Sequence, residues 1–519
     1  MASAFTRVGA LRAAAAITAS TYVTVALGLV VSTILARSLG PDDYGRYAYL
    51  LWLVGLLVTI GNHGLPIAAT RHIPEFKGAD HEADAASLYS WLKKWQWVSL
   101  VVTAAIFAAS IAFFEPIGWS SHRMLFAVLC VLCFIPKAFF YFHTSVAKGH
   151  GAFWIEAFGN TLMSVIYTLG VATLAWFHAS LNNNLWWFAG ISMAHMLTMT
   201  LMLRRSEIRG SSAPLAPEVR ARVQVHLRWT SLQVFVAALS NRTVETYLLG
   251  RLIGPAEVGY FAIATNLVRG GIELVSSSLT TILMPSLAHA RGAGGAAQVN
   301  LIVQDTLRYF TFLGGMTAGL GWLLAEPGVD LLYGHRYSTV AHAVQWMSVI
   351  SGIFLIETPF SSVLATLDDH RFRTSLSFLY FGLSAAFAIL LVPPYGIMGA
   401  IAANAVTRLC TFLMCSIWVT RRQQLTIPWM DMVRALLAIA GSMALAIGLN
   451  HLVGGTLIQW LAGLLYAVSL PCLMFFTGVW KPKDIELLLK VTQRLPTLAK
   501  WLAPLLKRMP ESATSKSSS

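Results

Sequence analysis

Four charged residues lie inside long apolar stretches, where ionisable side chains are rare. Arg242 and Glu245 are three positions apart, and Arg269 and Glu273 are four apart, so each pair would lie on one face of a helix. A charged side chain within hydrocarbon costs about 3 kcal/mol on insertion scales, and such residues usually face the protein interior or a wet cavity. An arginine in such a cavity can bind phosphate through two parallel hydrogen bonds. The two pairs are therefore candidates for binding an anionic substrate.

Further polar residues accompany these pairs. Asn266 precedes Arg269 by three positions, and Asn241 stands beside Arg242, so polar side chains would form a stripe along otherwise apolar helices. Three more basic residues lie within or at the ends of apolar stretches. The full candidate substrate-binding set is Arg242, Arg269, Arg71, Glu245, Glu273, Asn241, Asn266, Lys137 and Arg408.

A purely structural interpretation of the same charges stays open. An arginine can serve only to neutralise the carboxylate beside it, and a complete buried pair contributes little net stability. The apolar stretches contain as many acids as such pairing would need, namely Glu156, Glu245, Glu273 and Glu357.

Motifs for covalent or metal chemistry are missing from the sequence. It contains no Walker A glycine loop, no His-Glu-x-x-His pair and no nucleophile elbow. Cys130 and Cys133 have the spacing of a metal-binding pair, but no second pair accompanies them. We therefore expect no catalytic residue, no metal site, no cofactor and no enzymatic activity.

The composition identifies the elements that must position the charged residues. Of 519 residues, 56% are apolar and only 12% are charged, whereas a soluble protein would have about 25% charged residues. The apolar residues gather into runs of about 20, long enough to cross a bilayer as a helix. The expected fold class is an all-α polytopic membrane protein with about 14 transmembrane helices. The predicted spans are 14–36, 46–70, 95–114, 123–143, 153–177, 185–203, 229–250, 258–286, 308–326, 341–366, 374–392, 396–419, 431–451 and 455–478.

The basic residues predict the orientation of these spans. Most of the 37 Lys and Arg fall in the two tails and in the loops after even-numbered spans, and these segments are expected to be cytoplasmic. The net charge of +14 thus reflects membrane topology and not nucleic-acid binding. Residues 1 to 36 are expected to remain as the first span, because the apolar run is too long for a cleaved signal. Both termini would be cytoplasmic.

A turn motif occurs twice, with an offset of 214 residues. LARSLGPDDYGRYA begins at Leu35, and LGRLIGPAEVGYFA begins at Leu249. Six predicted spans separate the copies, so both enter the membrane in the same direction, and parallel repeats typically surround a central substrate path. We therefore predict two parallel six-helix repeats around a central cavity, plus two extra helices.

This duplication sets the expected domain boundaries. Residues 1–204 would form an N-lobe with helices 1–6, and residues 229–420 a C-lobe with helices 7–12. The remaining segments would be a basic cytoplasmic linker at 205–228, two further helices at 421–478, and an amphipathic cytoplasmic tail at 479–519 with a disordered end.

The repeated motif, the six-plus-six-plus-two plan and the segment WKPKDIELLLK resemble Wzx-type oligosaccharide flippases of the multidrug/oligosaccharidyl-lipid/polysaccharide exporter superfamily. The resemblance implies translocation of an undecaprenyl-diphosphate-linked oligosaccharide across a bacterial cytoplasmic (inner) membrane by alternating access. The product would serve O-antigen, capsule or exopolysaccharide synthesis. It also implies the bilayer and a lipid-linked oligosaccharide as partners, association with polysaccharide polymerase and chain-length machinery, and coupling to an H⁺ or Na⁺ gradient.

The resemblance further implies a cationic cavity. It carries over best to Arg242 and Arg269, with Arg71 as a gate residue and Lys137 and Arg408 as weaker candidates. The first span has no cation past Arg12, which departs from the lipid II flippases of the same superfamily.

Two other functions remain as alternatives. A cation-coupled drug antiporter of this superfamily would carry a carboxylate in the first span, but residues 13 to 36 contain none. A polysaccharide polymerase or ligase would need a large outer loop, and the longest outer segment is about residues 327 to 340.

Overall fold

The structure is a computed structural model that describes residues 7–117, 119, 122–240, 243–366, 370–453, 455–481 and 484. Helices account for nearly all of these residues, and no strand occurs among them. Eight helices in this part of the chain are long and apolar enough to cross a membrane. The predicted all-α fold is confirmed, and the number of fourteen crossings stays a prediction.

The chain divides into two compact units. The first comprises Met1–Leu274, Gly328–Met347 and Asp368–Met414, and the second comprises Val275–Pro327, Ser348–Leu367 and Cys415–Ser519. The units are defined by which residues lie close together in space, whereas the predicted lobes are defined by the sequence repeat. The lobe boundaries therefore remain a prediction.

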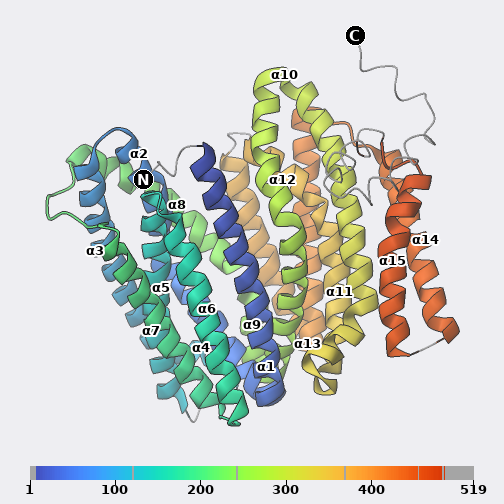
Figure 1. Cartoon of the computed structure of the whole chain (residues 1–519), viewed down its shortest axis with the longest axis horizontal. Helices are drawn as coiled ribbons and strands as arrows, with labels where there is room; N and C mark the ends of the chain where they lie inside the picture. Colours follow the sequence, from blue (N-terminus) through green and yellow to red (C-terminus); the bar gives the residue numbers. More distant parts are fainter. Residues whose placement is uncertain are drawn as a thin grey trace. The chain divides into compact units, whose positions relative to one another are not determined.

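The helices up to the second turn motif belong to the first unit. They are α1 (Arg7–Asn62), α2 (Leu65–Gly78), α3 (Glu82–Ala109), α4 (Ile111–Phe114), α5 (Arg123–Gly149), α6 (Phe153–Trp176), α7 (Leu181–Arg205), α8 (Pro217–Ser240), α9 (Thr243–Leu248) and the π-helix η2 (Leu249–Ile253). Helices α1 and α6 pack together, as do α5 and α7 (Figure 1). Their shared core includes Leu50, Phe126, Phe134 and Phe142, all with almost no exposed surface.

The later helices are divided between the units. They are α10 (Pro255–Tyr333), the 3₁₀ helix η3 (His335–Tyr337), α11 (Ser338–Leu355), α12 (Glu357–Thr366), α13 (His370–Gln423), α14 (Trp429–Val453) and α15 (Thr456–Phe476). Helices α14 and α15 cover the last two predicted spans and lie side by side (Figure 1).

Three long helices contain a sharp change of direction at a glycine. Gly40 in α1, Gly295 in α10 and Gly396 in α13 have positive φ angles of 78°, 63° and 54°. A side chain would strain this backbone conformation, whereas glycine adopts it freely. Each of these helices therefore corresponds to two predicted spans, and the predicted turn after residue 36 lies at Gly40.

The second predicted span, 46–70, is wrong at its C-terminal end. Helix α1 ends at Asn62 and α2 begins at Leu65, because His63 and Gly64 have φ angles of 28° and 90°. Pro66 explains part of this break, since proline lacks an N–H group and disfavours a helical conformation in the residue before it. The break gives the residues from 65 to 78 a helix of their own.

In the second unit, the start of the tail motif is fastened to α10. The Arg308 guanidinium donates to the carbonyl oxygen of Val479 at 2.7 Å and forms ion pairs with Asp305 at 2.7 Å and Asp484 at 3.1 Å. The Tyr466 hydroxyl of α15 also donates to the Gly315 carbonyl of α10 at 2.7 Å. The amphipathic helix and disordered end predicted beyond Asp484 lie outside the described residues.

Candidate functional site

Lys137 occupies the interior of the bundle formed by α1, α5, α6 and α7. It follows Pro136 within α5, its side chain is partly buried, and its Nζ lies 4.3 Å from the ring centroid of Phe188 in α7. The ring face attracts the ammonium group but leaves its charge in place. Within the part of the chain that the structure describes, no carboxylate forms an ion pair with Lys137. The bundle thus contains a cation that its own acids leave unneutralised.

Aromatic side chains from three helices meet at Phe188, the ring that contacts Lys137. The Phe188 ring packs against Tyr47 of α1 and Tyr167 of α6, with centroid distances of 6.2 and 6.0 Å. The hydroxyl groups of Tyr47 and Tyr167 hydrogen-bond to each other. Because these helices pack closely, the Phe188 ring has Lys137 and two tyrosines as neighbours, and tyrosine hydroxyl groups can donate to an anion or a sugar.

Glu245 is held by a residue of a distant helix. Its side chain is fully buried in α9, and the Ser384 hydroxyl of α13 donates to its Oε1 at 3.1 Å. Arg242 and Asn241 lie outside the described residues, so the predicted pairing of Arg242 with Glu245 remains a prediction. Sequence inspection did not identify Ser384, because it is 139 positions away.

The other predicted residues of the second half belong to α10 and α13. Asn266 and Arg269 are exposed on α10, and Arg408 is partly buried in α13. Glu273 belongs to α10, but its side chain lies outside the described residues. The predicted Arg269–Glu273 pair is therefore untested.

Arg71 takes part in a polar cluster between α2 and α8. Its guanidinium lies 3.2 Å from Nδ1 of His226, and the rings of His226 and His72 are 5.2 Å apart. Glu75 contacts His72 at 3.0 Å and Arg222 at 2.9 Å. Sequence inspection singled out Arg71 but missed His72, Glu75, Arg222 and His226. The spacing of residues 71, 72 and 75, which places them on one face of a helix, was the only local signal for this cluster. His226 of α8 lies 155 positions after Arg71 in the sequence.

The two copies of the repeated turn touch each other. A Cβ atom on Gly45 would overlap the carbonyl oxygen of Pro255, and one on Gly259 would lie 3.1 Å from the Cα atom of Gly45. Gly45 and Gly259 occupy the same position in the repeat, so the motif brings equivalent backbones together. This close approach explains why both copies have glycine there.

Further contacts join the two halves of the sequence at this end of the first unit. The Tyr337 hydroxyl donates to the Ala36 carbonyl at 2.7 Å, and Arg37 donates to the carbonyl oxygens of Leu331 and Leu332. The Ile117 amide donates to the Gly250 carbonyl at 3.0 Å. These contacts close the bundle where both Gly-Pro turns lie.

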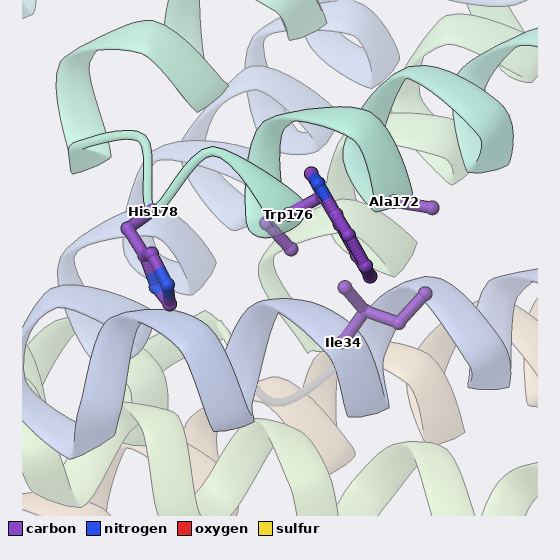
Figure 2. A pocket seen from close by; sticks show the side chains of 5 residues that line it. Ile34, Ala172, Trp176 and His178 are labelled. Atoms are coloured by element: carbon purple, nitrogen blue, oxygen red, sulfur yellow. The ribbon is translucent and has the colours of Figure 1, made fainter.

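A groove of about 510 Å³ lies beside the first turn, lined by Ile34, Ala172, Ala175, Trp176 and His178. Figure 2 shows Ile34 of α1 facing Trp176 of α6, with His178 at one end. The lining is predominantly apolar, so it suits a hydrocarbon chain better than a diphosphate.

Comparison with known proteins identifies relatives of this chain. The chain is 21% identical over 404 residues to the lipopolysaccharide biosynthesis protein WzxC of Escherichia coli K12, covering 77% of this chain and 76% of that protein. It is 20% identical over 405 residues to a putative O-antigen transporter of the same organism, covering 74% and 89%. These relatives confirm the resemblance to Wzx-type proteins.

Solved structures show the same fold. The lipid II flippase MurJ in an inward closed conformation superposes with a TM-score of 0.67 at 15% identity, covering 87% of this chain and 97% of that one. An inward-facing multidrug resistance transporter of the MATE family gives a TM-score of 0.61 at 14% identity, covering 78% and 94%. The model of the family described as polysaccharide biosynthesis protein matches residues 10–290, more than half of the chain. The chain therefore belongs to the polysaccharide biosynthesis protein family.

Proposed function

We propose that this protein is a flippase that moves an undecaprenyl-diphosphate-linked oligosaccharide across the bacterial cytoplasmic membrane by alternating access. The names of its relatives, which refer to lipopolysaccharide biosynthesis and O-antigen transport, support this substrate class. The family description and the flippase fold agree with it. The oligosaccharide would serve synthesis of O-antigen, capsule or exopolysaccharide.

The observation that carries the proposal is Lys137. An ammonium group within a predicted span is costly unless an anion compensates it, and no carboxylate does so among the described residues. The diphosphate of a lipid-linked sugar would supply the missing negative charge. Lysine attracts phosphate as a point charge with three donors that can rotate. Binding would therefore neutralise both groups at once.

The neighbouring side chains suit the rest of the headgroup. Tyr47 and Tyr167 each present a hydroxyl group that can exchange its partner for a phosphate or sugar oxygen. Phe188 offers a ring face next to the cation. Transport of this kind breaks no covalent bond, so it requires no nucleophile and no cofactor.

The predicted residues of the second half complete the proposal. Arg242 and Arg269, with Asn241 and Asn266, would provide donors to the substrate after it leaves Lys137, while Glu245 and Glu273 would set the local charge. Arg408 would be an additional cation, and Arg71 would act at the inner gate. A polysaccharide polymerase with its chain-length machinery would take up the product on the outer side.

Exchange of Lys137 tests the function. Lys137→Met keeps the length of the side chain and removes its charge, so we expect at least a tenfold loss of translocation, since about 1.4 kcal/mol of binding corresponds to a factor of ten. Lys137→Arg should retain part of the activity. The readout is lipid-linked oligosaccharide retained in the inner leaflet, normalised to the amount of protein in the membrane.

Lys148→Met is the matched control. Lys148 lies on the same helix but is paired with Glu156 at 2.8 Å, so its loss should leave translocation close to normal. Normal translocation by Lys137→Met would contradict the proposed role of Lys137. If deletion of the protein left surface polysaccharide unchanged and made cells sensitive to cationic drugs, the antiporter alternative would replace the flippase.

A further inference from the structure

The polar cluster between α2 and α8 has two separate links. Glu75 of α2 forms an ion pair with Arg222 of α8 at 2.9 Å, and Arg71 of α2 lies 3.2 Å from Nδ1 of His226 in α8. One helical turn further on, the Ser231 hydroxyl donates to the His63 carbonyl at 2.5 Å. Helix α8 is thus held to α2 by one ion pair and by one contact between an arginine and a histidine, and the histidine can change its charge with pH.

The geometry requires a neutral His226. A guanidinium group can only donate hydrogen bonds, so Nδ1 of His226 must accept from Arg71 and cannot carry a proton. The proton of the neutral ring then lies on Nε2, 3.4 Å from the Thr230 hydroxyl. Protonation of Nδ1 would remove the acceptor and place a second positive charge against Arg71.

The surrounding groups reinforce this preference. Burial, followed by the charges of Arg71 and His72, lowers the pKa of His226. Burial also lowers the pKa of His72, although Glu75 acts in the opposite direction. The hydrogen bond from His72 and the charge of Arg222 lower the pKa of Glu75, so this carboxylate stays ionised near neutral pH.

Besides α2, helices α1 and α9 pack against α8. Glu245 of α9 accepts a hydrogen bond from Ser384 of α13. Helix α1 also packs against α8, but after Arg46 it contains no charged residue. His63 directly follows α1 and contacts α8 through its backbone carbonyl. Glu75 is the acid of this cluster, and His72 and Arg222 already engage it. While α2 and α8 stay together, the nearby positive charge therefore disfavours a proton on His226.

We propose that His226, with His72 beside it, is a proton-binding site whose occupation releases α8 from α2. With the helices together, His226 is neutral. When they separate, the ring leaves Arg71 and His72 and can bind a proton. Binding of a proton to His226 and contact between α2 and α8 therefore exclude each other.

The direction of the pH dependence follows from this competition. A histidine whose pKa is lowered in the joined state stabilises that state above its free pKa of about 6.5, and the stabilisation is lost as the pH falls below that value. If only the separated state binds the proton, a fall from pH 7.5 to 5.5 favours separation by about tenfold for one histidine. The contact should therefore hold at neutral pH and open in acid.

This inference builds on the proposed function by naming the proton as the coupling ion. Movement of α8 away from α2 would be the step at which a proton influences transport. The experiment below measures helix separation without substrate, so its result stands apart from the translocation assay of Lys137.

The test uses spin labels at Ala79 and Ala221, two exposed positions near the facing ends of α2 and α8, in full-length protein with its five cysteines replaced. Distance distributions are measured by pulsed electron resonance in lipid nanodiscs at pH 7.5 and 5.5. We expect the ratio of long to short distances to rise about tenfold at pH 5.5. His226→Gln should abolish this rise, because the amide oxygen can still accept from Arg71 but glutamine does not titrate.

Arg222→Gln is the matched control. It should lengthen the distances at both pH values and retain their pH dependence, since Glu75 stays ionised throughout. Arg71→Gln should reduce the pH dependence, because it removes the charge that opposes protonation, and it provides a second test if His226→Gln misfolds. An unchanged distribution in the parent protein, or full pH dependence in His226→Gln, would overturn the proposal.

Discussion

Two cations, one in each unit, have opposite surroundings. Arg308 in the second unit is 3% exposed and is held by two carboxylates, Asp305 and Asp484. Lys137 in the first unit is partly buried against Phe188, and no acid pairs with it among the described residues. The protein therefore neutralises the cation that holds the chain together. The cation for which we propose a role in substrate binding has no carboxylate partner among the described residues.

The largest effect should come from Arg308→Met. The substitution leaves Asp484 buried without its cation, and breaking a buried ion pair in this way costs about 3–5 kcal/mol. The free energy of unfolding in detergent, together with the amount of protein in the membrane, provides the measurement.

A triple variant checks the cause of that effect. Arg308→Met combined with Asp305→Asn and Asp484→Asn removes all three charges and should recover part of the lost stability. If it proves no more stable than Arg308→Met alone, packing and not charge explains the role of Arg308.

Lys148→Met should have an intermediate effect. Its pair with Glu156 is partly exposed, with 33% and 15% of the two side chains accessible, so screening limits the loss to about 1 kcal/mol. Thermal unfolding in detergent measures this loss. A cost as large as that of Arg308→Met would show that partial exposure does not weaken the ion pair of Lys148 with Glu156.

Lys137→Met should have the smallest effect on stability, below about 1 kcal/mol, because it leaves no carboxylate without a partner. Thermal unfolding in detergent measures this effect. Comparison with the translocation assay separates a loss of function from a loss of stability. A stability loss above about 3 kcal/mol would assign Lys137 to the structural class of Arg308.

The prediction from sequence succeeded where neighbouring residues carry the information. Apolar runs about 20 residues long predicted the helical membrane fold, and Gly40 with Pro41 marked the bend within α1. The same local signals failed at His63 and Gly64, where the predicted span continued but the helix ends. Gly64 and Pro66 indicate a helix break here, but the prediction followed the surrounding apolar residues and continued the span.

The candidate site was only partly predictable for the same reason. Lys137 stood out as a charge in an apolar stretch, but the ring that contacts it, Phe188, belongs to α7 and packs against Tyr47 and Tyr167 of two further helices. Glu245 also accepts a hydrogen bond from Ser384, a partner 139 positions away that the sequence did not indicate. Likewise, His226 looked like an ordinary residue of a basic linker until α8 placed it against Arg71.

The sequence by itself determined the helical membrane fold, the duplicated turn and the family, because these depend on composition and on spacing along the chain. Only the tertiary structure decided that Gly45 meets Pro255 and Gly259, that Arg308 is neutralised by Asp484, and that His226 must be neutral. Each of these facts joins residues more than 150 positions apart, and such contacts arise from helix packing, which no local pattern encodes.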